Sequence, residues 1–184
     1  MARVPLHSRS ARTEQLPVMR TVPHATYNAS VLEILLRAGL DLPSETYAAA
    51  LLHPALEQGV VTVEESEALA GSDAAAMASS LTRDIFYYAA PPAERERRYL
   101  ESLAIVCGRY PYILHLAMAS RMHALESAST LDASQRRCLV KETGELSLPF
   151  FRGHLPKSSY AHLRSYSMLL STLERTLRAS AEAN

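Results

Sequence analysis

Residues 117–124 read AMASRMHA and residues 51–58 read LLHPALEQ, and these two stretches decide how the rest of the chain is interpreted. Each is an apolar helical pattern that a few polar residues interrupt. His53 and Glu57 lie four positions apart, so they share one face of a helix if Pro54 is accommodated there. The two stretches therefore predict two helices that each carry a small set of polar side chains.

The remaining sequence also has helical periodicity. Val31, Ile34, Leu35 and Ala38 fall at i, i+3, i+4 and i+7, and Gly39 is expected to end that helix. No alternating strand pattern is present. Further helices are expected over about 93–107, 110–127, 132–146 and 157–180. The sequence predicts an all-α bundle over residues 20–184, preceded by a flexible N-terminal arm over residues 1–19.

Local signals predict where two of the helices begin and end. Ser44 is expected to be the N-cap of a helix that runs to His53, which Pro54 ends or kinks. Thr62 followed by Glu65 predicts a capping box for a short helix.

The two opening stretches resemble motifs of HD-domain phosphohydrolases, of the RelA/SpoT branch that hydrolyses the alarmone (p)ppGpp. Residues 51–58 are similar to the family's Leu-Leu-His-Asp-x-x-Glu-Asp helix, and residues 117–124 to its Leu-Ala-Asp-Arg-Leu-His-Asn helix. The order and separation of the motifs also agree, and the resemblance runs from about Arg20 to Arg178. It implies an HD-domain-like helical bundle.

The resemblance also implies that the metal site has degenerated. The family binds a divalent cation, usually Mn²⁺, through two His and two Asp. Carried over by position, these ligands become Tyr27, His53, Pro54 and Ser120, of which only His53 is an effective metal ligand. His24, three residues before Tyr27, is the alternative as a shifted ligand. We therefore expect no metal and no cofactor.

Positions that serve the family's substrate have changed as well. The catalytic Glu-Asp pair reads Glu57-Gln58, and the Asn that contacts substrate reads Ala124. The basic loop before the first His is reduced to the segment that begins at Arg20. The resemblance thus argues against (p)ppGpp hydrolysis.

If the HD-like scaffold holds, His53, Glu57 and Tyr27 face one central pocket and form a metal-free acid/base set. The alternative is that His53 fills the former metal site and hydrogen-bonds Glu57 without catalysis. The pocket is expected to be lined by His24, Ser120, His123 and Arg20.

Charge excludes some partners. The formal net charge is 0, so no global field favours nucleic acid. Residues 41–82 hold seven carboxylates and neither Lys nor Arg, which disfavours a polyanionic nucleotide. The run RERR at 95–98 is interpreted as a solvated helix face.

Apolar runs and cysteines bear on localisation. The apolar runs are far shorter than the about 20 residues of a membrane span. Cys107 and Cys138 have no metal-site spacing and are expected to be buried free thiols. We predict a cytoplasmic protein. The sequence leaves open whether it forms a homodimer.

Three functions compete at this stage. The favoured one is a metal-independent enzyme of lyase, isomerase or cyclase type that acts on a non-nucleotide small molecule, for instance in specialised biosynthesis. The second is an inactive pseudohydrolase that regulates by binding a partner protein or an alarmone-like ligand. The third is a residual hydrolase whose rearranged metal site uses His24, His53 and nearby carboxylates.

Overall fold

The computed structural model describes the backbone of residues 24–82, 91–157 and 159–182, with side chains there except at 24–28 and 92–93. Over these ranges the regular elements are helices without a strand, which confirms the predicted all-α class. The helices are α1 (His24–Arg37), α2 (Ser44–Glu57), α3 (Val63–Ala70), α4 (Ser72–Leu81), α6 (Pro92–Val106), α7 (Ile113–Glu126), η1 (Ala128–Thr130), α8 (Ala133–Glu142), η2 (Thr143–Ser147), α9 (Leu148–Gly153) and α10 (Tyr160–Glu182).

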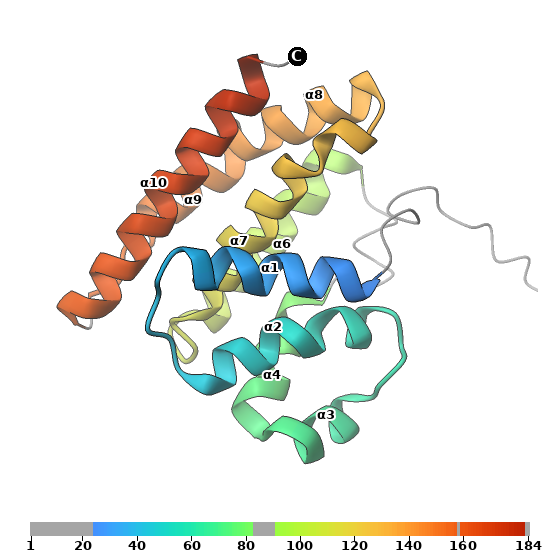
Figure 1. The fold of residues 1–184 in the computed structure, drawn as a ribbon, viewed down its shortest axis with the longest axis vertical. Coiled ribbons are helices and arrows are strands. Elements are labelled where there is room, and N and C mark those ends of the chain that lie inside the picture. Colours follow the sequence, from blue (N-terminus) through green and yellow to red (C-terminus); the bar gives the residue numbers. More distant parts are fainter. Residues whose placement is uncertain (1–23, 83–90, 158, 183–184) are drawn as a thin grey trace, which may run out of the picture.

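Helix α7 forms the centre of the bundle. Eleven of its 14 residues are buried, as expected for a helix that is apolar on nearly every face. It packs against both α1 and α10, while α2 packs against α1, α3 and α4. In Figure 1, α2 to α4 lie below α7, α1 crosses in front of its lower part, and α8 and α10 lie above it and to its left. The stretch at 117–124 is thus the middle of the core.

The start of α2 differs by one residue from the prediction. Pro43 takes the N-cap position and Ser44 is the first helical residue. Ser44 Oγ lies 3.1 Å from a carboxylate oxygen of Glu45 and caps no backbone N–H. The prediction of Ser44 as N-cap was therefore wrong.

Helix α2 also continues past Pro54. Pro54 was predicted to end or to kink the helix, and the end is wrong because the helix runs to Glu57. Pro54 is buried inside the helix, and its missing N–H removes the one hydrogen bond that this position would donate to the carbonyl oxygen of Ala50. The carbonyl oxygen of Pro54 accepts from Gln58 Nε2 at 2.7 Å, which ties the last turn together.

Helices α8 and α9 are joined by the π-helix η2, where one uninterrupted helix was expected up to residue 146. Pro149 lies in the first turn of α9 and lacks the N–H that a regular α-helix would use there. Thr143 and Ser147, at the two ends of η2, are buried. Their hydroxyl groups therefore lie in the core.

Other expectations can be compared directly. The capping box is confirmed: Thr62 Oγ1 accepts from the Glu65 N–H, and Glu65 Oε2 accepts from the Thr62 N–H. Gly39 follows α1 with φ +61°, as a C-terminal stop requires. The predicted arm, residues 1–19, lies outside the described residues.

The cysteines are free but are not buried as expected. Cys107 is half-buried and Cys138 is exposed. Cys138 lies on α8, which has no buried residue, because this short helix covers the outside of the bundle. Within the ranges that the structure describes, no helix has the length and apolar character needed to cross a membrane.

Candidate active site around His53

The three helices that carry the predicted site residues pack against one another. Helix α1 contacts α2 and α7, and α2 also contacts α7. The backbones of His24 and Tyr27 lie in the first turn of α1, and their side chains fall outside the described set. Arg20 lies outside the described residues altogether. The described part of the site therefore consists of residues on α2 and α7.

His53 and Glu57 form a close pair on α2. His53 Nε2 lies 3.4 Å from Glu57 Oε2. The His53 side chain is 8% exposed and that of Glu57 is 21% exposed, so the carboxylate still reaches solvent. The pair depends on the helix passing through Pro54, because only a continuous helix keeps residues i and i+4 on one face.

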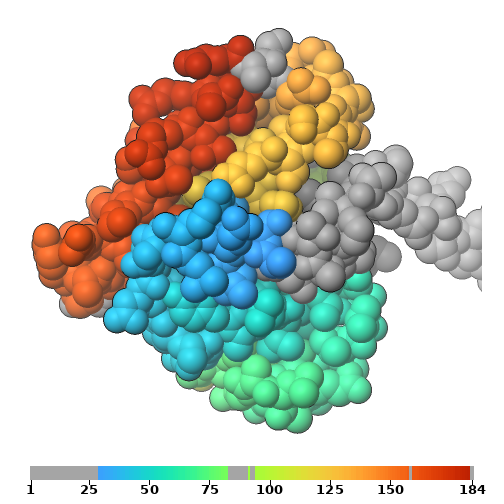
Figure 2. All heavy atoms as spheres, in the orientation of Figure 1, coloured from blue at the N-terminus to red at the C-terminus, as the bar shows by residue number. Residues whose placement is uncertain are grey.

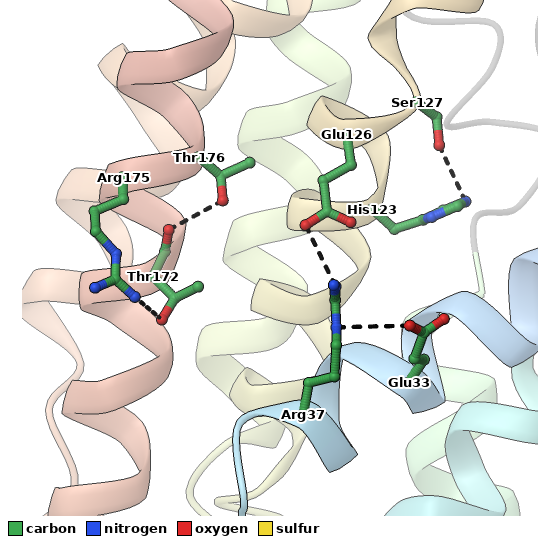
Figure 3. Close-up of polar contacts among 8 residues, drawn as sticks. All are labelled: Glu33, Arg37, His123, Glu126, Ser127, Thr172, Arg175 and Thr176. Atoms are coloured by element: carbon green, nitrogen blue, oxygen red, sulfur yellow. Dashed lines mark hydrogen bonds and ion pairs between the residues drawn. The ribbon is translucent and has the colours of Figure 1, made fainter.

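Helix α7 supplies Ser120 and His123, of which Ser120 is half-buried and His123 is buried. His123 Nε2 lies 3.5 Å from Ser127 Oγ at the end of the helix. Figure 3 shows this contact beside Glu126, which turns toward Arg37 of α1. Burial lowers the pKa of His123, and the nearby Glu126 raises it by less. The contacts of His123 thus tie α7 to its own C-terminal turn.

A buried polar network lies next to Ser120 and joins α7 to α6 and the π-helix. Arg121 forms an ion pair with Glu96 of α6, and Ser147 Oγ of the π-helix donates to Glu96 Oε1 at 2.7 Å. Glu96 is 2% exposed, so the solvated face predicted for 95–98 was wrong at this position. Burial raises the pKa of the neighbouring Glu142, an effect that Arg121 reduces.

A second polar group in the core is a histidine stack between α7 and α10. The rings of His115 and His162 are stacked with centroids 5.2 Å apart, and Tyr112 stacks on His162 at 4.4 Å. Burial, with a smaller contribution from His162, lowers the pKa of His115 to about 3. The His115 ring is therefore neutral at physiological pH.

Hydrogen bonding selects the tautomer of His115. Ser165 Oγ donates to the His162 carbonyl oxygen at 2.9 Å and lies 3.0 Å from His115 Nε2. Since the hydroxyl proton is already used, Nε2 is the ring nitrogen that carries the proton. Among the described side chains, His115 Nδ1 finds no hydrogen-bond partner. The stack therefore joins α7 to α10 through ring contacts and the hydrogen bond between His115 and Ser165.

The donor chemistry around His53 does not fit the cation that the family resemblance implies. Pro54 has no donor atom in its side chain, and Ser120 offers only a neutral hydroxyl. In residues 29–82, 91–157 and 159–182, the described side chains form no group of three or more His, Cys, Asp or Glu placed to hold a metal ion. The shifted ligand His24 lies outside that set.

A hollow of about 580 Å³ lies along α10, and none of its lining residues belongs to the helix that carries His53. It is lined by Tyr160, Leu163, Arg164, Ser167, Met168, Ser171, Thr172 and Arg175. All of these residues belong to one helix, so the hollow is a shallow surface groove. We call these eight residues the α10 groove.

Comparisons with known proteins leave the motifs as the basis of the family resemblance. No protein-family model matches the chain, and neither a curated protein nor a solved structure matches it significantly.

Proposed function

We propose that this protein is a metal-independent enzyme on an HD-like scaffold, acting by proton transfer on a non-nucleotide small molecule. The observation that carries the proposal is the His53–Glu57 pair, with its nitrogen and oxygen 3.4 Å apart in a largely buried setting. In the sequence resemblance, the pair aligns with the family's metal-binding His motif. A lyase, isomerase or cyclase reaction suits it, because such reactions proceed by positioning and proton transfer.

The geometry assigns a role to each partner. Glu57 faces Nε2 of His53, so it favours the tautomer with the proton on Nε2 and stabilises the imidazolium when it forms. Tyr27, on α1, would supply a hydroxyl as the complementary acid. We also propose that the protein works in the cytoplasm, where the free thiols of Cys107 and Cys138 stay reduced.

Untargeted mass spectrometry tests this function. The wild-type protein is incubated with a small-metabolite extract, in parallel with folded His53→Gln and Glu57→Gln variants. We expect at least one metabolite to be consumed by the wild type, with a rate at least about 100-fold lower for His53→Gln. A matched control is His154→Gln, because His154 follows α9, outside the candidate site, and its Nδ1 lies 2.8 Å from the Phe150 carbonyl oxygen. Equal turnover by the wild type and both pair variants would overturn the proposal.

A second candidate is a regulatory module without catalysis. The observation in its favour is the α10 groove, an exposed surface with apolar and cationic side chains. Calorimetric titration with ppGpp distinguishes the alarmone-binding form of this candidate. Binding heat without hydrolysis would favour a pseudohydrolase, and the absence of heat would remove that ligand.

A further inference from the structure

The α10 groove is a surface that combines apolar area with positive charge. Tyr160 is 81% exposed and Met168 is 45% exposed, which is unusual for side chains of this size. Arg164 and Arg175 are exposed on the same face, and no carboxylate lines the groove. The nearby Glu174 is already paired with Arg152 at 2.9 Å. A partner should therefore be apolar and acidic.

The spacing of the two arginines decides the size of that partner. They are eleven residues apart, which is about 16 Å along a helix axis. A single phosphate or carboxylate reaches only one of them. The groove therefore fits an extended acidic surface.

The chain itself carries such a surface on and around α3. Residues 41–82 have seven carboxylates and no Lys or Arg, while the other residues have 19 cations and 12 carboxylates. Glu64 and Glu67 are exposed on α3, and backbone hydrogen bonding lowers the pKa of Glu64, so it stays anionic. Val60 and Leu69 are 69% and 72% exposed beside them. We call residues 60–69 the α3 surface.

The two surfaces of one molecule cannot meet each other. In Figure 1, α3 lies at the lower end of the fold and α10 at the upper left, with α1 and α2 between them. Figure 2 shows the same separation in the space-filling view. Complementary patches on different sides of a molecule pair between copies, as a heterologous contact or as two reciprocal contacts.

We propose that the α10 groove binds the α3 surface of a second copy of this chain. The groove would lie along the α3 surface of the other copy, with Arg164 and Arg175 at the two ends of the contact and Glu64 and Glu67 between them. Tyr160 and Met168 would cover the exposed Val60 and Leu69. The proposal is independent of any chemistry at His53. It predicts a self-association that depends on the charges of the α10 groove and of the α3 surface.

Light scattering and sedimentation over a dilution series test the proposal. The mass of the wild type should rise above the 20.3 kDa of the monomer with concentration at about 0.1 M salt and fall toward it at about 1 M salt. Two charge-reversed variants are then compared. One is Arg164→Glu/Arg175→Glu, and the other is Glu64→Lys/Glu67→Lys. Glu65 is left unchanged because it closes the capping box.

Each variant alone should stay monomeric, because its two surfaces then carry charge of the same sign. An equimolar mixture should associate again, since the acidic α10 of one variant faces the basic α3 of the other and the remaining pair is also opposite in sign. The control Arg137→Glu/Lys141→Glu makes the same change on exposed positions of α8 and should associate like the wild type.

Three results would overturn the proposal. They are a wild type that stays monomeric throughout, variants that associate as well as the wild type, and a mixture that remains monomeric. Circular dichroism confirms that each variant is folded, so a negative result reports on the surfaces.

Discussion

Among the carboxylates that lie beside a basic side chain, Glu96 and Glu57 have different surroundings. Glu96 is 2% exposed and is held by Arg121 and by the hydroxyl of Ser147. The Glu57 side chain is 21% exposed and faces His53 from 3.4 Å. A buried charge depends on its protein partners because water cannot replace them, whereas water can solvate an exposed charge that loses a partner. Glu96 is therefore expected to serve stability, whereas the exposure of Glu57 is compatible with the chemical role proposed for it.

The largest effect is expected from Arg121→Met. The substitution leaves the Glu96 carboxylate buried without its cation, which typically costs about 3–5 kcal/mol of unfolding free energy. Urea denaturation followed by circular dichroism measures it. The double variant Arg121→Met/Glu96→Gln should regain part of the loss because the buried charge is gone. A double variant less stable than the single one would show that charge is not the cause.

Ser147→Ala should have the next largest effect. It removes the hydroxyl that donates to Glu96 Oε1 at 2.7 Å, and hydrogen bonds to charged groups contribute about 1.5–3 kcal/mol. The same urea experiment applies. Ser167→Ala, on the exposed face of α10, is the control and should change the stability by less than about 0.5 kcal/mol. Equal effects of the two substitutions would contradict the importance of the network.

His115 extends the comparison to a buried base without a carboxylate. Its pKa is about 3 in the folded protein and 6.5 in the reference state, so below pH 6.5 the unfolded chain binds a proton that the folded chain refuses. Stability from this group is complete above pH 6.5 and is lost as the pH falls toward 3. The loss between pH 7 and pH 5 should be about 2 kcal/mol.

Unfolding at the two pH values, with His115→Leu as the comparison, measures this contribution. The variant should lose less stability on acidification than the wild type. Ser165 keeps its bond to the His162 carbonyl oxygen in the variant, so no new buried hydroxyl is left without a partner. Parallel pH curves for the two proteins would place the acid sensitivity elsewhere, for instance at His123 or His162, whose pKa values burial also lowers.

The sequence predicted the helices well because burial of one face imposes the helical period, as the pattern beginning at Val31 shows. The same period also indicates that Glu96 is buried. Glu96, Tyr99, Leu100 and Leu103 fall at i, i+3, i+4 and i+7, and all four are buried. The adjacent arginines at 95, 97 and 98 obscured it.

Other features depend on tertiary packing and could not be predicted. The π-helix before Pro149 and the continuation of α2 through Pro54 both contradict local expectation. The spacing of His53 and Glu57 predicted their contact correctly. The contact forms because the helix continues past Pro54. The partner of Arg121 lies on another helix, at a sequence distance that no local pattern bridges.

Glu57→Gln should have the smallest effect on stability, below about 1 kcal/mol, because a partly exposed pair four residues apart on a helix contributes little. Its effect on turnover should be much larger, since the amide no longer stabilises the His53 imidazolium. A reduced maximal rate with an altered pH profile would separate this role from a structural one. A stability loss as large as that of Arg121→Met would instead make Glu57 a second structural carboxylate and remove the contrast on which its chemical role rests.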